Sequence, residues 1–347
     1  MLSKKSKGYF VELSAGTFTV ARTSAASAPF VIEEVRSCSA EKSGEITTLL
    51  AELQPKRSGA GKYVHAVCGV YPPSGMVRRA VIDPKRLEEA AYLEEAAASN
   101  CRITPSEYLL SALSTQSGLD LGALSAPEKE ILFAGISLAD VSAVQKQFLS
   151  QGIFPDRLEL GTVAVLGAVA DYRAYAKVDA PTLVLEVKDQ TIESFVVGDK
   201  GVEASRPVSQ GIEAMIPIIQ KELGLKDEES ARRLFLSNTF DFTGMASAFT
   251  KKLIKELQSS IGFYEVHTGQ SIGQVLCTLL PTKLAWLQGA IATQLGVDSM
   301  KIDFEPWLKS RDILLSASAQ KQFAANPAIL GIVSLLLEHR HAAVQEA

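Results

Sequence analysis

Cysteine is scarce in this chain of 347 residues, and its few copies follow no pattern. The four cysteines lie far apart with no paired spacing; they are Cys38, Cys68, Cys101 and Cys277. This spacing gives no support for the disulfide framework that small secreted domains use. We therefore expect reduced, buried thiols and a cytoplasmic protein.

Long apolar runs and excess charge are missing as well. The longest apolar run, from Ala328 to Leu337, is half the length needed to span a bilayer. No signal peptide is expected, because Glu12 places a charge before a hydrophobic core can develop. The basic start, with Lys4, Lys5 and Lys7, is typical of a solvated terminus. The net charge of −4 gives no electrostatic reason to expect nucleic acid as a partner.

The chain does contain enough apolar sequence for two globular domains. It is too long for one ordinary domain, and 47% of its residues are apolar. The opening pattern predicts a meander of three strands, a helix and a buried strand, at 9–13, 18–21, 30–35, 47–53 and 63–70. This order of elements predicts α/β layering.

An inserted unit is predicted after the stretch "YPPSGMVRRAVIDPKRLEEAAYL", residues 71–93. Asp83 is suited to cap a helix and Pro84 to occupy its first position, so we expect a helix from Lys85 to about Ala98. The pattern then predicts a strand and two helices, at 131–136, 140–149 and 158–172. Residues 84–154 are therefore interpreted as an inserted subdomain of mixed type.

The second half repeats the opening pattern. Three more strands are expected at 182–187, 192–197 and 201–206, and a helix with one apolar face follows from Ile212. Further elements are predicted as helices from 227, at 246–263, at 282–295 and at 326–338, and as strands at 275–280 and 300–304. A duplicated meander that flanks an insertion is the actin-like arrangement, which holds ATP between its two hairpin turns.

Several segments resemble the PilM family, the cytoplasmic actin-like proteins of the type IV pilus inner-membrane platform and relatives of FtsA. The similarity is clearest in the second half, in "VEASRPVSQGIEAM" from Val202 and "KELGLKDEESARRL" from Lys221. "FLSQGIFPDRLELGTVAVLGAV" from Phe148 is similar to the segment that joins the two lobes of the family. "KLIKELQSSIGFYEV" and "KLAWLQGAIATQLGV" resemble its long helix and the helix after its adenosine loop.

The resemblance implies an α/β, actin-like fold of two lobes with an inserted 1C-type subdomain. Lobe I would comprise residues 1–180, with subdomain 1A at 1–83 and 155–180 and the insertion at 84–154. Lobe II would comprise 181–347, with a 2B-like part near 225–270, and its last helix, 326–338, could pack back on lobe I. The resemblance also implies an ATP cleft and a groove near subdomains 1A and 1C for the short cytoplasmic N-terminal segment of a PilN-like membrane protein.

The loops that would hold ATP and Mg²⁺ depart from the family pattern. Where the family has Asp-x-Gly followed by hydroxyl residues, this chain has Glu12 and Ser14, with Thr17 further on. Glutamate extends the charge by one methylene, and serine adds a Cβ where the backbone should approach phosphate. Gly16 could restore this loop if the hairpin were shifted.

The other two loops show the same loss. In the second, Glu186 stands for the aspartate and Lys188 for the glycine; in the adenosine loop, Leu280-Pro281-Thr282-Lys283 replaces a glycine pair. Pro281 also removes an amide donor. We therefore expect a degenerate nucleotide site and no cofactor, with ATP and Mg²⁺ as the alternative. A solvated or lysine-paired carboxylate is the more ordinary interpretation of Glu12 and Glu186.

Other candidates have less support. Ser58–Gly61 lacks the order of a phosphate-binding loop, and His339 and His341 are too close in sequence to share a helix face. His65 and His267 are expected to be structural. Arg78 and Arg79 are expected near the subdomain junction, solvated or in contact with a partner. Arg206 is expected in an ion pair between lobes, with a relic of phosphate handling as the alternative.

The sequence thus predicts a PilM-like adaptor of type IV pilus assembly that is cytoplasmic, peripheral to the inner membrane, and more a scaffold than an enzyme. The alternatives are an active actin-like ATPase of the pilus or type II secretion platform, a sugar-kinase-like enzyme, and an FtsA-like filament former. A kinase needs a catalytic aspartate in its cleft, and no aspartate has a convincing context.

Overall fold

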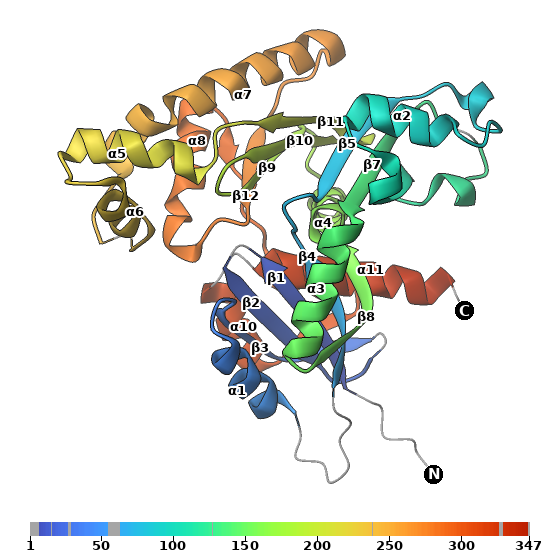
Figure 1. Cartoon of the computed structure of the whole chain (residues 1–347), viewed down its shortest axis with the longest axis horizontal. Coiled ribbons are helices and arrows are strands. Elements are labelled where there is room, and N and C mark those ends of the chain that lie inside the picture. The colour runs from blue at the N-terminus through green and yellow to red at the C-terminus, as the bar shows by residue number, and fades with distance from the viewer. Residues whose placement is uncertain are drawn as a thin grey trace. The chain divides into compact units, whose positions relative to one another are not determined.

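The computed structural model describes residues 7–14, 16–26, 29–54, 63–126, 128–237, 239–325 and 329–345 (Figure 1). The chain forms two compact units. Unit 1 comprises Met1–Tyr172 and Asp303–Ala347, and unit 2 comprises Arg173–Ile302. Each unit is built around its own β-sheet.

The sheet of unit 1 has six strands in the order β14-β3-β2-β1-β4-β8. Its bounds are β1 Gly8–Ser14, β2 Thr17–Thr23, β3 Phe30–Ser39, β4 Val64–Val70, β8 Ile153–Leu160 and β14 Ile313–Leu315. The first three strands form the predicted antiparallel meander, while β4, β8 and β14 pair in parallel. Such parallel pairs need crossover connections, which the helices of this unit supply.

Helices cover both faces of this sheet. On one face, α1 (Ser43–Leu53) and α3 (Leu138–Ser150) bury a core that includes Val11, Leu50 and Phe148. On the other face, α11 (Leu330–Gln345) packs against β1, β2 and β4. Unit 1 also contains α9 (Phe304–Lys309), α10 (Ala317–Ala325) and α4 (Gly161–Ala176) as far as Tyr172.

A second, smaller sheet is inserted in unit 1. Its order is β5-β7-β6, with bounds Met76–Val81, Glu130–Ser137 and Tyr108–Ser114, and its pairs are antiparallel. The helix α2 (Tyr92–Cys101) packs on one face through Tyr92, Ala97 and Phe133. An insertion with its own small core is therefore present.

Unit 2 repeats the arrangement of the larger sheet. Its strand order is β11-β10-β9-β12-β13, with bounds β9 Thr182–Val187, β10 Ile192–Gly198, β11 Gly201–Val208, β12 Gln274–Thr278 and β13 Asp298–Ser299. Again an antiparallel meander is followed by parallel strands. Its helices are α5 (Ile216–Leu223), α6 (Glu228–Ser237), α7 (Ala246–Thr268) and α8 (Trp286–Leu295). This repeated topology confirms the predicted actin-like fold class.

Three predicted elements are wrong in type or extent. The helix expected from Lys85 is a short 3-10 turn at Pro84–Arg86, and α2 begins only at Tyr92. The helix expected from residue 158 begins at Gly161, because Leu158 pairs with Cys68 in the parallel sheet. The strand expected at 300–304 is instead the short strand β13, Asp298–Ser299, and Phe304 begins α9.

The unit boundaries differ from the predicted domains. Residues 303–325, expected in the second lobe, lie in unit 1 because β14 pairs with β3. The last helix, α11, covers the same sheet, in agreement with the expectation that it could pack back on the first lobe. The inserted sheet spans 76–137 and not 84–154, since α3 packs on the six-stranded sheet. Within the described residues, no helix combines the length and apolar character that a membrane span requires.

Candidate functional site

Glu12, the acidic residue of the first predicted phosphate loop, is enclosed inside unit 1. It lies in β1 between Thr19 of β2 and Gly69 of β4, and only 5% of it is exposed. Its carboxyl group lies against Gly331 in the first turn of α11, where a Cβ would overlap it. Burial raises the pKa of Glu12 to about 8, although a hydrogen bond with Tyr71 acts in the opposite direction. A carboxyl group held in this way is mostly protonated at neutral pH.

A row of small and polar residues crosses the sheet beneath α11. The strand register aligns Ser37, Thr19, Glu12, Gly69 and Glu159 on five neighbouring strands. The hydroxyl groups of Ser37 and Thr19 share a hydrogen bond of 3.0 Å. A side chain at Gly69 would meet the Leu335 side chain of α11, so the glycine permits close helix packing.

Glu159 is a partly buried carboxylate of unit 1 that the sequence analysis missed. Its pKa is raised to about 7, mainly by burial; Arg157, whose Nε lies 2.7 Å from Oε1, acts to lower it, and Glu338 acts to raise it. The sequence shows only a glutamate in an apolar stretch. Its relation to Glu12 follows from the position of Gly69 between them, which only the strand register reveals.

The first hairpin turn does not move Gly16 into the position of Ser14. Ser14 pairs with Thr17 at the end of the hairpin, and Gly16 lies in the turn with φ +72°. Gly16 also accepts a backbone hydrogen bond of 2.9 Å from Ala40. The register that would have restored the glycine is therefore not adopted, and Ser14 remains at the strand end.

In unit 2, the acidic residue of the second loop is paired with lysine. Glu186 is only 2% exposed, and the Nζ atom of Lys188 lies 2.8 Å from its Oε1 atom. Glu193 lies directly opposite on β10 and is buried as well, while Thr278 is the neighbour on β12. The ammonium group of Lys188 thus faces a carboxylate of its own chain, as the more ordinary interpretation expected.

The backbone of the second turn is bonded to the segment that starts the next helix. The N–H groups of Gly211, Ile212 and Glu213 donate to the carbonyl oxygens of Gln190, Lys188 and Asp189, at 3.2, 3.2 and 2.8 Å. A Cβ at Gly211 would overlap the backbone of Asp189. Amides of the kind that bind phosphate at helix starts are therefore already used by the turn itself.

The loop predicted to correspond to the family's adenosine loop contains a residue other than glycine with positive φ. Leu279 has φ +60°, a conformation in which an ordinary side chain is strained, and Leu280 and Pro281 follow. The sequence analysis examined 280–283 and missed Leu279. Pro281 lies just before the 3-10 turn Thr282–Leu284, and its carbonyl accepts the N–H of Leu284 at 2.7 Å.

Aromatic side chains fill the space next to this loop. Trp286, at the start of α8, stacks on Phe242 with ring centroids 6.3 Å apart, and Phe235 and Phe249 meet both rings edge to face. Helix α6, which carries Phe235, packs directly on the 3-10 turn. The loop is thus supported by a packed aromatic core inside unit 2.

The junction of the inserted subdomain is held by a polar network. Ser74 donates through its backbone N–H and its hydroxyl to Asp140 Oδ2, at 3.0 and 2.6 Å, and Ser137 N–H donates to Ser74 Oγ at 3.0 Å. Ser137 is the N-cap of α3 and accepts from the Asp140 amide. The chain's entry to the insertion at Ser74 is therefore tied to its exit at Ser137.

The remaining candidates have local partners. Arg79 pairs with Glu130 across the inserted sheet at 2.5 Å, and Arg78 Nη1 donates to the carbonyl of Val77. Arg206 donates to Ser260 Oγ at 3.0 Å within unit 2, which is not the ion pair that we expected.

The two exposed histidines are bound locally through Nδ1. His65 lies 2.7 Å from Asp156, and His267 lies 2.8 Å from the carbonyl of Phe263. No group of His, Cys, Asp and Glu suited to a metal ion occurs in the described part of the chain. Predictions for residues 4, 5, 58–61, 326 and 327 and for the side chains of His339 and His341 lie outside what the structure describes.

Comparison with known proteins gives a match at the level of structure. No protein-family model matches the chain, and no curated protein matches it by sequence. A chain of a PilM-PilN type IV pilus biogenesis complex is similar with a TM-score of 0.69 and 18% identity, over 96% of this chain and 98% of that one.

Two more distant structures are a Bacteroides thetaiotaomicron protein with an actin-like ATPase fold and the cytoplasmic domain of EpsL, a Vibrio cholerae type II secretion component. Their TM-scores are 0.46 and 0.42, their identities 9% and 11%; each covers 97% of this chain, and the matches cover 99% and 95% of those chains. The chain therefore resembles, in fold and over nearly its whole length, a chain of a PilM-PilN type IV pilus biogenesis complex.

Proposed function

We propose that this protein is a PilM-like adaptor of type IV pilus assembly, which binds the cytoplasmic N-terminal segment of a PilN-like inner-membrane protein. One observation carries the proposal: the fold matches a chain of a PilM-PilN complex over 96% of this chain and 98% of that one. A match of both lobes and of the insertion supports a shared mechanical role better than a match of one lobe would. Cytoplasmic placement beside the inner membrane belongs to the same proposal.

We further propose that the adaptor works without ATP hydrolysis. Features of the first two loops support this proposal. Glu12 is enclosed beneath α11, Lys188 is held by Glu186, and the amides of Ile212 and Glu213 are used by the second turn. Without bare glycine backbone and free amides, the loops lack the groups that hold phosphate in such sites.

The partner's segment is expected near the junction of the larger sheet and the insertion. The Ser74–Ser137–Asp140 network supports this expectation, because it holds the two sides of that junction in one arrangement. A preorganised groove binds a flexible segment at a lower entropic cost than a mobile one.

Two measurements on the full chain test the proposal. A fluorescent peptide from the cytoplasmic N-terminus of a PilN-like protein should bind and raise Tm, and Ser74→Ala should weaken binding several-fold. Ser260→Ala, which removes a hydroxyl of unit 2, is the matched control. Absence of binding to the wild type would contradict the adaptor role.

ATP with Mg²⁺ at millimolar concentration should leave Tm unchanged. A ligand present at 100 times its Kd would stabilise the protein by about 2.7 kcal/mol, a shift of several degrees. Such a shift, lost in Glu12→Ala, would favour an active ATPase. Sedimentation of polymer with ATP would favour the filament former.

A further inference from the structure

The outer edge of β3 is only partly covered in unit 1. The short strand β14 pairs with Phe30–Ile32, and Ser316 adds bonds to the carbonyls of Ile32 and Glu33. In the part of the chain that the structure describes, no strand pairs with the outer side of 34–39. The N–H of Ala40 points inward to Gly16, so by strand alternation the backbone groups of Val35 and Ser37 point outward.

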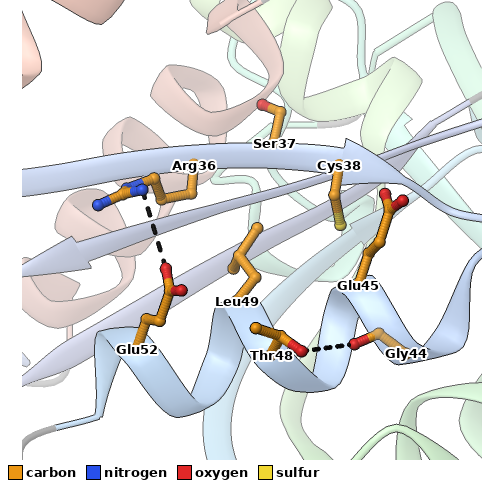
Figure 2. A pocket seen from close by; sticks show the side chains of 8 residues that line it. All are labelled: Arg36, Ser37, Cys38, Gly44, Glu45, Thr48, Leu49 and Glu52. Atoms are coloured by element: carbon orange, nitrogen blue, oxygen red, sulfur yellow. Dashed lines mark hydrogen bonds and ion pairs between the residues drawn. The ribbon is translucent and has the colours of Figure 1, made fainter.

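A groove of about 420 Å³ runs between this strand edge and α1 (Figure 2). It is lined by Arg36, Ser37, Cys38, Gly44, Glu45, Thr48, Leu49 and Glu52. Figure 2 shows Cys38 pointing toward α1, Leu49 rising from the helix toward the strand, and Ser37 pointing to the opposite side of the sheet. The groove therefore has an apolar floor beside a strand edge that no described strand pairs, which suits an extended chain with alternating side chains.

The rim of the groove is acidic. Glu45 and Glu52 project from α1, and the single arginine of the lining, Arg36, is bound by Glu34 at 2.5 Å and also pairs with Glu52 at 3.9 Å (Figure 2). Lys42 pairs with Glu45 at 2.8 Å, but the side chains of these pairs on α1 are exposed, and such pairs contribute little. The lining itself carries two carboxylates and one guanidinium group, and this excess of one negative charge favours a cationic occupant.

We propose that this groove, defined by β3 residues 34–39 and α1, binds an extended basic segment of a partner protein by strand addition. The segment continues the sheet where β14 ends, with an apolar side chain over Cys38 and Leu49 and a lysine or arginine at Glu45 and Glu52. A second copy of this chain is disfavoured because it would bring two acidic rims together. The site is separate from the subdomain junction, so the inference does not depend on the proposed function.

The test is selection of random 12-residue peptides displayed on phage against the full-length protein. The selected peptides should be rich in lysine or arginine alternating with β-branched residues. The double change Glu45→Lys, Glu52→Lys should weaken their binding at least 10-fold, and they should protect Cys38 from maleimide in a mass-spectrometric map. Acidic peptides, or peptides that leave Cys38 fully reactive, would overturn the proposal.

Blocking variants distinguish the groove from other surfaces. The Gly44→Trp variant places a large side chain in the groove from α1, at a position where an added Cβ would meet no atom within 4 Å. Gly262→Trp in α7 is the matched control, because an added Cβ there would also meet no atom within 4 Å. Binding should be lost only in the first. Ser37→Pro should also abolish binding, because it removes an outward N–H of the edge strand.

Three further results would overturn the proposal. These are equal binding by both tryptophan variants, unchanged binding by a folded Ser37→Pro variant, and a dimer of the wild type that Gly44→Trp dissociates. The last result would assign the edge to a second copy of the chain. Thermal melting shows which variants are folded. If the Ser37→Pro variant does not fold, the Gly44→Trp variant still tests the proposal.

Discussion

The two halves of the molecule neutralise equivalent carboxylates in different ways. Glu12 and Glu186 occupy the same place in the duplicated meander, two residues before Ser14 and Lys188, and both are buried. In unit 1 the carboxyl group is covered by the first turn of α11 and retains a proton to about pH 8. In unit 2 the carboxylate has a lysine 2.8 Å away. At the same position of the repeat, the carboxyl group is therefore covered by a helix in unit 1 and paired with a cation in unit 2.

The largest expected effect comes from the proton on Glu12. Its pKa is about 8 in the folded chain and near 4.5 when unfolded, so between these values the folded state binds more protons. Unfolding free energy therefore falls as pH rises from about 4.5 to 8, by about 3 to 5 kcal/mol if the full shift is realised. Denaturant unfolding of wild type and Glu12→Gln from pH 5 to 9 measures this directly.

The free energy of unfolding of Glu12→Gln should equal that of the wild type near pH 5 and exceed it at pH 8. Glu159 contributes a slope of the same sign, from about 4.5 to 7, so the variant keeps part of the dependence. Parallel curves for the two proteins would show that Glu12 is ionised in the folded state.

The second largest effect should follow from Lys188→Met. This change removes the ammonium partner of a carboxylate that is only 2% exposed, and we expect a loss of about 2 to 3 kcal/mol at pH 7. The double variant Glu186→Gln, Lys188→Met should recover most of it, because neither member of the pair then carries a charge. If the single variant melts with the wild type, the lysine does not stabilise Glu186, and the contrast between the two halves is lost.

The smallest effect concerns the strained backbone of the adenosine loop. Leu279→Gly and Leu279→Ala both remove the leucine side chain, but only glycine adopts φ +60° without strain. We expect the glycine variant to be the more stable by about 0.5 to 1 kcal/mol. At Lys283, in the following 3-10 turn, we expect the opposite result, with the alanine variant more stable than the glycine variant. The same order at both positions would show that Leu279 is not strained.

Local sequence patterns predicted much of the fold because they report short-range rules. Alternation revealed both meanders, and the spacing of Glu12 and Glu186 relative to their hairpin turns was correct. Predicted elements and boundaries were wrong where strand pairing between residues far apart in the sequence overrides the local preference for helix or strand. Leu158 looked helical but is held in a strand by Cys68, and residues 303–325 join unit 1 through the pairing of β14 with β3.

The amino-acid sequence alone determined the repeated α/β pattern and the insertion, because these depend on residue type and spacing. That Ser14, Lys188 and Pro281 stand in place of glycines is what the resemblance to the PilM family implies. Only the tertiary structure decided what surrounds the two carboxylates. Gly331 is more than 300 positions from Glu12 along the chain, yet it covers that carboxyl group because α11 packs across the sheet. Burial and partner choice, and therefore charge, arise from contacts that local periodicity does not encode.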